Sequence, residues 1–168
     1  TIDVPPTLVS FAVAPGDVRR VNSGHLQAPF STIVLLRPIG ATGNTAPPSA
    51  AFNIVLTQLS PLIENQKVLS VRALGFGGIA EGLFLMGLGN RLGVQFEDSF
   101  DAEALFKPAL GSFLVELAEP EDIGILLGES TTAYHWHLPG EHVELDDVQK
   151  AYEEKLEPVF PYRAPGPN

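Results

Sequence analysis

Short apolar runs alternate with polar, glycine-rich and proline-rich segments along the chain. Runs rich in valine, isoleucine, leucine and phenylalanine, bounded by such breaks, predict β-strands. We expect strands over residues 7–13, 31–37, 68–74, 92–96, 111–117, 132–138 and 141–145. The first two are apolar on both faces, as in strands covered on both sides. The last two flank Pro139-Gly140 and predict a hairpin.

Other segments carry helical signals. Ser49 is placed to cap a helix over 50–66, in which Pro61 predicts a kink or a break. Its expected buried stripe consists of Phe52, Leu56, Leu59 and Ile63. We also predict helices over 79–90, 102–106, 120–127 and 146–156. The polar segment 17–27 is consistent with a loop or with a short irregular helix.

The helix predicted over 79–90 contains three glycines, Gly82, Gly87 and Gly89. Each glycine inside a helix costs about 1 kcal/mol relative to alanine. Their presence predicts that the helix backbone packs closely against a sheet or another helix.

The mixture of strands and helices predicts an α/β or α+β domain with one mixed sheet of four to six strands and packed helices. We assign residues 1–145 to this domain. Residues 146–168, a polar helix and a proline-rich end, are interpreted as a linker.

The chain has 168 residues and a formal net charge of −10, which disfavours binding to nucleic acid or to an anionic membrane. Since it has no cysteine, disulfides, thiolate metal sites and cysteine nucleophiles are excluded for this chain. No apolar run approaches the ~20 residues that a membrane-spanning helix needs. We expect a cytoplasmic protein, and the start at Thr1 suggests a piece of a longer one.

The best candidate site is the Gly-Phe-Gly-Gly turn at Gly75, Phe76, Gly77 and Gly78, between a predicted strand and a predicted helix. A glycine-rich turn that opens a helix directs unpaired N–H groups at the positive end of the helix dipole, and such a place can hold a phosphate. The alternative is a plain connection in which glycines supply positive φ angles. Possible accessory groups are Arg72, Glu81 and Arg91.

A second candidate is the histidine group of the predicted hairpin. His135 and His137 share a strand face, and His142 on the partner strand, with Glu141 and Glu144 nearby, suggests a zinc site. Against this, histidine is common at solvent-facing hairpin ends. We therefore predict no metal here and leave the role of these histidines open.

No residue pattern predicts a catalytic group. Ser10, Ser70 and Ser112 lie on predicted strands without a nucleophile-elbow pattern. The adjacent acidic pairs, Glu97-Asp98 and Glu121-Asp122, stand at element ends, where acidic residues commonly cap helices.

Several segments in chain order carry a family resemblance. They are Leu-Gly-Phe-Gly-Gly-Ile-Ala-Glu-Gly-Leu at 74–83, Gly-Asn-Arg-Leu-Gly-Val at 89–94, Leu-Phe-Lys-Pro-Ala-Leu-Gly-Ser-Phe at 105–113 and Leu-Glu-Pro-Val-Phe-Pro at 156–161. These segments resemble phosphoribosylformylglycinamidine synthase, the glutamine-dependent enzyme of purine biosynthesis. The opening, 6–13 with Asp17-Val18-Arg19, is similar to the start of that family's second aminoimidazole-ribotide-synthetase-like C-terminal domain.

The resemblance implies a sandwich of the aminoimidazole-ribotide-synthetase C-terminal type, partly like a ferredoxin fold, cut from a longer polypeptide. The full ligase uses ATP and magnesium to activate the formyl oxygen of formylglycinamide ribonucleotide, and ammonia from glutamine then forms the amidine. The implied partners are the other synthetase domains, the glutaminase domain and the ribonucleotide at a domain seam. We expect no cofactor on this fragment, no activity of it alone, and a possible dimer.

Carried over by residue, the family's glycine-rich turn falls on Gly75, Gly77 and Gly78, where it implies a contact with the substrate phosphate. Many members have Asp-Gly-Gly there, preceded by a His-Asp pair, whereas this chain has Phe76-Gly77-Gly78 preceded by Arg72-Ala73-Leu74. That departure indicates a separate branch and leaves a carboxylate role at the turn unsupported. The alternative is a non-catalytic interaction domain of this or a related enzyme, such as aminoimidazole ribotide synthetase, thiamine-phosphate kinase or selenophosphate synthetase.

Overall fold

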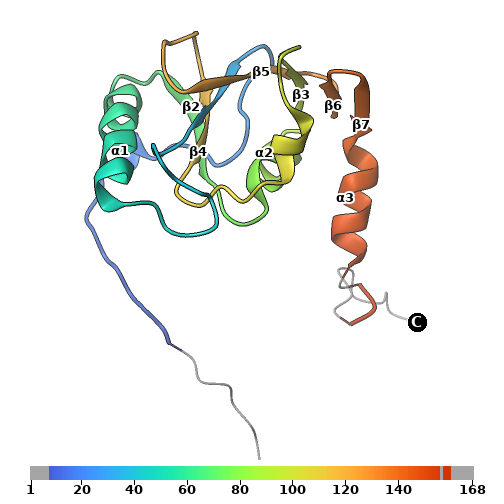
Figure 1. The fold of residues 1–168 in the computed structure, drawn as a ribbon. Helices are drawn as coiled ribbons and strands as arrows, with labels where there is room; N and C mark the ends of the chain where they lie inside the picture. The colour runs from blue at the N-terminus through green and yellow to red at the C-terminus, as the bar shows by residue number, and fades with distance from the viewer. Residues whose placement is uncertain (1–7, 156, 160–168) are drawn as a thin grey trace, which may run out of the picture.

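The computed structural model describes residues 8–155 and 157–159, with the side chain of Arg19 excepted. Within them, seven strands form one sheet in the order β2-β4-β1-β5-β3-β6-β7 (Figure 1). The strands are β1 Thr32–Leu36, β2 Val68–Ala73, β3 Gly93–Phe96, β4 Phe113–Leu117, β5 Ile125–Thr131, β6 His135–Leu138 and β7 Glu141–Glu144. Neighbouring strands are antiparallel except β3 and β6, which are parallel.

Three α-helices accompany the sheet: α1 Ser49–Glu64, α2 Gly78–Leu88 and α3 Leu145–Glu154. Two short 3₁₀ helices, η1 Val18–Arg20 and η2 Ala102–Phe106, lie in the connections. The described helices include none that is long and apolar enough to cross a membrane.

The two larger helices cover opposite faces of the sheet. On β1, Ile33 and Leu35 belong to the core cluster that contains α2, whereas Val34 and Leu36 belong to the cluster that contains α1. Successive strand side chains point to opposite faces, so this alternation places one helix on each side. The α1 cluster includes residues of β1, β2 and β4 only, among the strands, while the α2 cluster extends across to β6.

The expected fold class is confirmed, with a sheet larger than the four to six strands predicted. The strands at 31–37, 68–74, 92–96 and 111–117 and the hairpin around Pro139-Gly140 are present with slightly different ends. Close packing at the α2 glycines is also confirmed. A Cβ at Gly82 would collide with the Leu74 and Leu114 side chains, and one at Gly87 would meet the Leu92 carbonyl at 2.5 Å.

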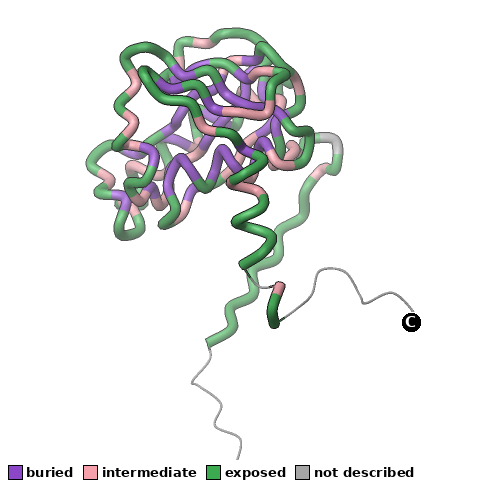
Figure 2. Tube along the Cα trace, turned by 90° about the vertical axis from the view of Figure 1, so that its right-hand side faces the viewer, coloured by how far each residue is buried: buried purple, intermediate pink, exposed green. Residues whose placement is uncertain are grey.

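The predicted strand over 7–13 is wrong for its described part. Residues 8–13 have no regular structure and extend away from the body, with Leu8, Phe11 and Val13 at least 90% exposed (Figures 1 and 2). A β-rich sequence becomes a strand only where a neighbouring strand supplies hydrogen-bond partners, and the sheet offers this segment none. Thr7 lies outside the described residues.

The helix predicted over 120–127 is also wrong. Gly124 has a φ of +68°, a conformation that ends a right-handed helix. A Cβ at this position would collide with the Leu35 carbonyl, so only glycine fits there. The apolar residues that follow form β5, which pairs with β1 and β3 in the middle of the sheet. The acidic residues before Gly124 therefore precede a strand and not a helix.

Helix α1 differs from its prediction in two details. It continues through Pro61 without a break, and its fully buried side chains are Val55 and Leu59 and not the whole predicted stripe. Pro61 lies on the exposed side of the helix. Water can therefore bind the carbonyl that a proline leaves without its helical donor.

A buried carboxylate joins the central strands to the segment that precedes β1. Glu116 on β4 has no exposed surface, and its oxygens accept hydrogen bonds from the Gln27 and Ala28 amides at 2.9–3.0 Å. They also accept from the hydroxyls of Ser31, at 2.8 Å, and Ser70, at 2.6 Å. Each donor replaces a water that the charge loses on burial, so the group can stay in the core.

Helix α3 leaves the body of the domain and is largely exposed beyond its first turn (Figures 1 and 2). Its first residue, Leu145, is fully buried, and Tyr152 makes an edge contact with Phe84 of α2 at 5.4 Å between ring centroids. The helix therefore begins in the core, whereas a linker role for 146–168 stays a prediction. Leu156 and residues 160–168 lie outside the described residues.

Candidate functional site

The glycine-rich turn has the predicted strand–turn–helix geometry, with β2 before it and α2 after it. Gly78 has a φ of +65°, and a Cβ there would collide with the Lys107 carbonyl and lie 2.8 Å from that of Leu105. The Gly75 carbonyl accepts from the amides of Gly78, at 3.3 Å, and Ala109, at 3.0 Å. These backbone contacts with the η2 region fix the shape of the turn and require glycine at 78.

The turn leaves amide donors unpaired. Among the hydrogen bonds of the described residues, none has the N–H of Gly77, Ile79 or Ala80 as its donor, while the Glu81 N–H donates to the Gly77 carbonyl at 3.3 Å. Such unpaired donors and the helix dipole together favour an anion. They are the physical basis of the predicted phosphate site.

The carboxylate of Glu81 lies beside these donors. A Cβ placed on Gly77 would collide with it, so the side chain is folded back over the first turn of α2. Glu81 is exposed, and no ion pair or hydrogen bond of the described residues holds its carboxylate. An incoming anion would therefore compete with a side chain that can rotate into solvent.

The two predicted accessory arginines lie apart from each other. Arg72 is on β2, where its guanidinium lies near Gly24. Arg91 lies beyond the C-terminal end of α2 and donates to Asp146 at 2.6 Å and to Gln149 at 3.3 Å. An eleven-residue helix is about 16 Å long, so α2 separates Arg91 from the turn.

Arg91 has a local role at that far end. Its guanidinium lies 4.3 Å from the centroid of the Tyr134 ring, and the hydrogen bond to Asp146 raises its pKa. Burial raises the pKa of Tyr134. These contacts connect the start of α3 to the body of the domain.

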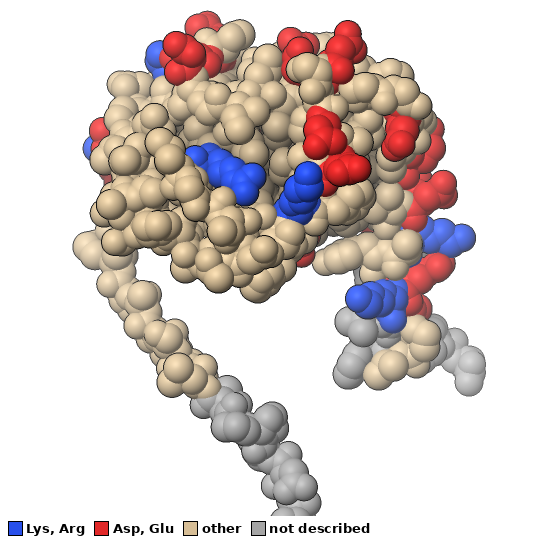
Figure 3. Space-filling model, in the orientation of Figure 1, with Lys and Arg blue, Asp and Glu red and all other residues tan. Residues whose placement is uncertain are grey.

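Two cations that the sequence did not single out line a pocket that Ile79, the residue after the turn, also lines. Arg37 and Lys107 line a pocket of about 260 Å³ together with Ile79, Ser99 and Asp101. Arg37 follows β1 and donates to the Ala41 carbonyl at 3.0 Å, and Lys107 lies 3.8 Å from Asp101. The sequence signal was weak, since a single basic residue after a strand or within a loop is usually solvated. Over the face in Figure 3, basic side chains are few and acidic ones are more numerous.

A wider groove of about 630 Å³ lies between α2, η2, the β6–β7 hairpin and α3. Most of its lining is apolar, with Phe84, Phe106, Trp136 and Tyr152 among its residues. The indole Nε1 of Trp136 is buried and has no hydrogen-bond partner among the residues that the structure describes. Glu81, which lies beside the turn, also lines this groove.

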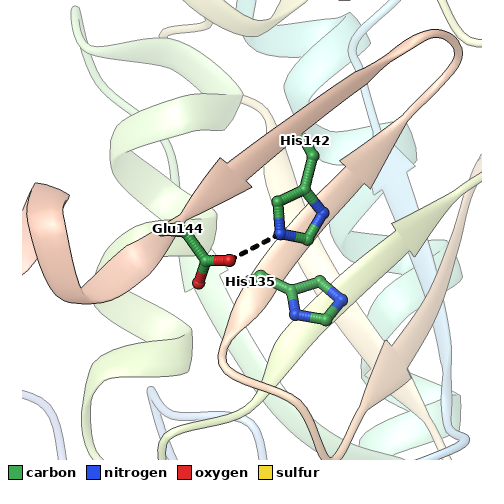
Figure 4. A group of neighbouring side chains, drawn as sticks. All are labelled: His135, His142 and Glu144. Carbon is green, nitrogen blue, oxygen red and sulfur yellow. Dashed lines mark hydrogen bonds and ion pairs between the residues drawn. The ribbon is translucent and has the colours of Figure 1, made fainter.

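The predicted histidine hairpin is present, and its register places His137 opposite His142 and His135 opposite Glu144. The structure groups His135, His142 and Glu144, whose possible ligand atoms all lie within 4.8 Å of one another (Figure 4). His137 is outside this group, and Glu141 lines the groove on the opposite side of the sheet.

The serines at positions 10, 70 and 112 lie in three different surroundings. Ser70 is buried and donates to Glu116, and Ser112 is buried with a hydroxyl that has no partner within the described part of the chain. Ser10 lies in the exposed N-terminal segment. The predicted absence of a catalytic group in this chain stays a prediction.

Comparison with known proteins gives structural matches only, since no family model and no curated protein sequence matches the chain. Thermotoga maritima PurL complexed with AMPPCP matches with a TM-score of 0.63 at 15% identity, over 77% of this chain and 27% of that one. The chain has a PurL-like fold. The same organism's PurL complexed with FGAR matches with a TM-score of 0.62 at 13% identity, over 78% of this chain and 30% of that one.

A crystal structure described as phosphoribosylformylglycinamidine synthase II from T. maritima gives a TM-score of 0.62 at 16% identity. The chain spans only 27–30% of the length of these PurL structures. Identities this low establish the PurL-like fold and leave ligands and activity to be argued from the site.

Proposed function

We propose that this chain is a domain of a PurL-like, ATP- and glutamine-dependent ligase that converts formylglycinamide ribonucleotide to its amidine. Its contribution would be a phosphate-binding turn at Gly75, Phe76, Gly77 and Gly78, facing the ribonucleotide at a seam with other domains of the polypeptide. The observation that carries this proposal is the set of unpaired amides at Gly77, Ile79 and Ala80, on a fold that resembles PurL. A cytoplasmic location is part of the same proposal.

In this mechanism the chain binds and orients, and the chemistry takes place on other domains. The backbone amides would donate to phosphate oxygens, while the glycine at 78 keeps the turn in the shape that presents them. ATP with magnesium supplies the activation of the formyl oxygen when bound. Among the described residues, no group of three or more potential metal ligands includes Glu81 or Asp101, so the residues around the turn do not fit a magnesium site built from protein ligands.

The direct test is a titration of the chain with inorganic phosphate and with ribose 5-phosphate, followed by amide chemical shifts. The Gly77, Ile79 and Ala80 amides should shift in a saturable manner at millimolar ligand, because their N–H groups gain acceptors. Shifts confined to other residues, such as those around Arg37 and Lys107, would contradict the assignment of the turn.

Replacement of Glu81 with glutamine should tighten phosphate binding. The substitution removes one negative charge a few ångströms from the bound anion, worth about 1 kcal/mol in water, or roughly a fivefold lower Kd. Glu154→Gln, at the exposed end of α3, changes the net charge equally and serves as the matched control. An equal change in the phosphate Kd of the two variants would mean that binding depends only on the net charge of the chain and does not occur at the turn.

A second candidate function is that of an interaction domain, in which the turn is only a connection. It is favoured by the apolar groove of about 630 Å³ and by the exposed apolar side chains of residues 8–13. Such surfaces commonly mark contacts with other domains or chains. Light scattering coupled to size exclusion tests the simplest form, a dimer of this chain, and a concentration-independent monomer would contradict that form.

A further inference from the structure

The second face of the sheet is bare over the β3–β6–β7 end. Trp136 and Leu138 of β6 point into the core that contains α2, so the alternation of strand side chains directs His135 and His137 to the opposite face. Helix α1 covers that opposite face only over β1, β2 and β4, among the strands. The histidines therefore lie on the part of the sheet that no described helix covers.

On this bare face, two neighbouring strands bring three metal-binding side chains together. His142 Nε2 lies 2.8 Å from Glu144 Oε1, and the rings of His135 and His142 are 4.4 Å apart between centroids (Figure 4). All three ligand atoms lie within 4.8 Å of one another. His135 and Glu144 are directly opposite each other, and His142 is diagonal to His135, so the β6–β7 register fixes the group.

In place of the absence of a metal expected from the sequence, we propose that His135, His142 and Glu144 form a binding site for a divalent transition-metal ion, with zinc as the best fit. Two imidazoles and one carboxylate are a common zinc ligand set that leaves a fourth position for water or another ligand. Bonds of about 2.0–2.2 Å around a tetrahedral ion hold donor atoms about 3.3–3.6 Å apart. In the structure the three ligand atoms lie within 4.8 Å of one another, so small side-chain rotations bring them to the spacing that the ion requires.

The surroundings favour the cation. The chain carries a net charge of −10, and Glu144 supplies a negative charge next to the two imidazole ligands. His142 and Glu144 are exposed and His135 is half-buried, so an ion can enter without rearrangement of the core. Oxygen-preferring ions such as Mg²⁺ are a poor match for two imidazole nitrogens.

The site would link the β6–β7 hairpin to α3. Glu144 is the residue immediately before α3, so an ion bound to it and to His135 on β6 joins the hairpin to the start of that helix. This inference is independent of the proposed phosphate turn, because the histidines lie on the sheet face opposite α2.

Calorimetric titration of the full chain with ZnCl₂ at neutral pH tests the proposal. We expect one saturable site, a zinc-dependent rise in Tm and no heat from MgCl₂ at the same concentration. His142→Ala should weaken binding at least about tenfold, which corresponds to a loss of about 1.4 kcal/mol. The rise in Tm should disappear in the same variant.

The matched control is His137→Ala, which removes a histidine from the same face of the same hairpin but not from the group. It should change the Kd by less than about twofold, and Glu144→Gln should behave like His142→Ala. Since all three side chains tested are exposed or at the surface, circular dichroism will show that the variants fold. Failure of the wild-type chain to bind zinc saturably, or equal weakening by His137→Ala and His142→Ala, would overturn the proposal.

Discussion

Glu116→Ala is expected to lower the free energy of unfolding by roughly 3–5 kcal/mol. The variant leaves the part-buried Gln27 and Ala28 amides without their acceptor, and a donor left unsatisfied on burial costs about 1–3 kcal/mol. The Ser31 and Ser70 hydroxyls lose a charged partner as well. Chemical denaturation followed by circular dichroism measures the change.

Two further variants make this prediction specific. Glu116→Gln keeps the shape and one acceptor oxygen, so its loss should be smaller than that of Glu116→Ala. Glu129→Gln, on the exposed side of β5, should stay within about 0.5 kcal/mol of the wild type. A loss for Glu116→Ala no larger than that for Glu129→Gln would show that the buried network contributes little.

Gly78→Ala should cost roughly 2–4 kcal/mol and abolish phosphate binding at the turn. A non-glycine residue at a φ of +65° costs about 1–3 kcal/mol, and the new Cβ also meets the Lys107 and Leu105 carbonyls. Those obstacles are backbone atoms, which cannot rotate aside as a flexible side chain would. The turn and η2 must therefore move apart, and the unpaired amides then no longer point at one common position where a phosphate could bind.

Gly75→Ala is the matched control in the same turn. A Cβ at Gly75 has no atom within 4 Å, and its φ is not in the left-handed region. We expect a change in stability within about 0.5 kcal/mol and phosphate binding close to that of the wild type. Denaturation curves and amide shifts of both variants give the comparison, and equal stability of Gly78→Ala and Gly75→Ala would refute the packing argument.

The parts of the fold that the sequence predicted are those with local signals. The β6–β7 hairpin has Pro139-Gly140 between two short strand sequences, and the turn before α2 has three glycines within four residues, so neighbouring residues determine both. The errors occurred where distant residues decide. Residues 8–13 have a strand sequence without a partner, and 125–131 became a strand because β1 and β3 are there to pair with it.

The same distinction applies to the sites. The amides of the Gly75–Gly78 turn follow from consecutive residues, whereas the donors around Glu116 come from positions 46 to 89 residues away. The visible signal for Glu116 was a lone acid within the apolar run Phe-Leu-Val-Glu-Leu. The metal-ligand group was only half predictable, because alternation places His135 and His137 on one face but the diagonal approach of His142 depends on the packing of the two strands.

The strand order has a consequence for how this chain is made. The inner strand β1 ends at Leu36, yet both of its partners, β4 and β5, come from residues 113–131, and β4 and β5 are separated by β1 although they are consecutive in the chain. At about 5–20 residues per second, a ribosome needs roughly 5–20 s to add that intervening length. During this interval the most apolar strand of the domain has exposed edges and no sheet to join. Nascent chains of this protein are therefore expected to depend on chaperones until β5 has emerged and β1 can pair along both of its edges.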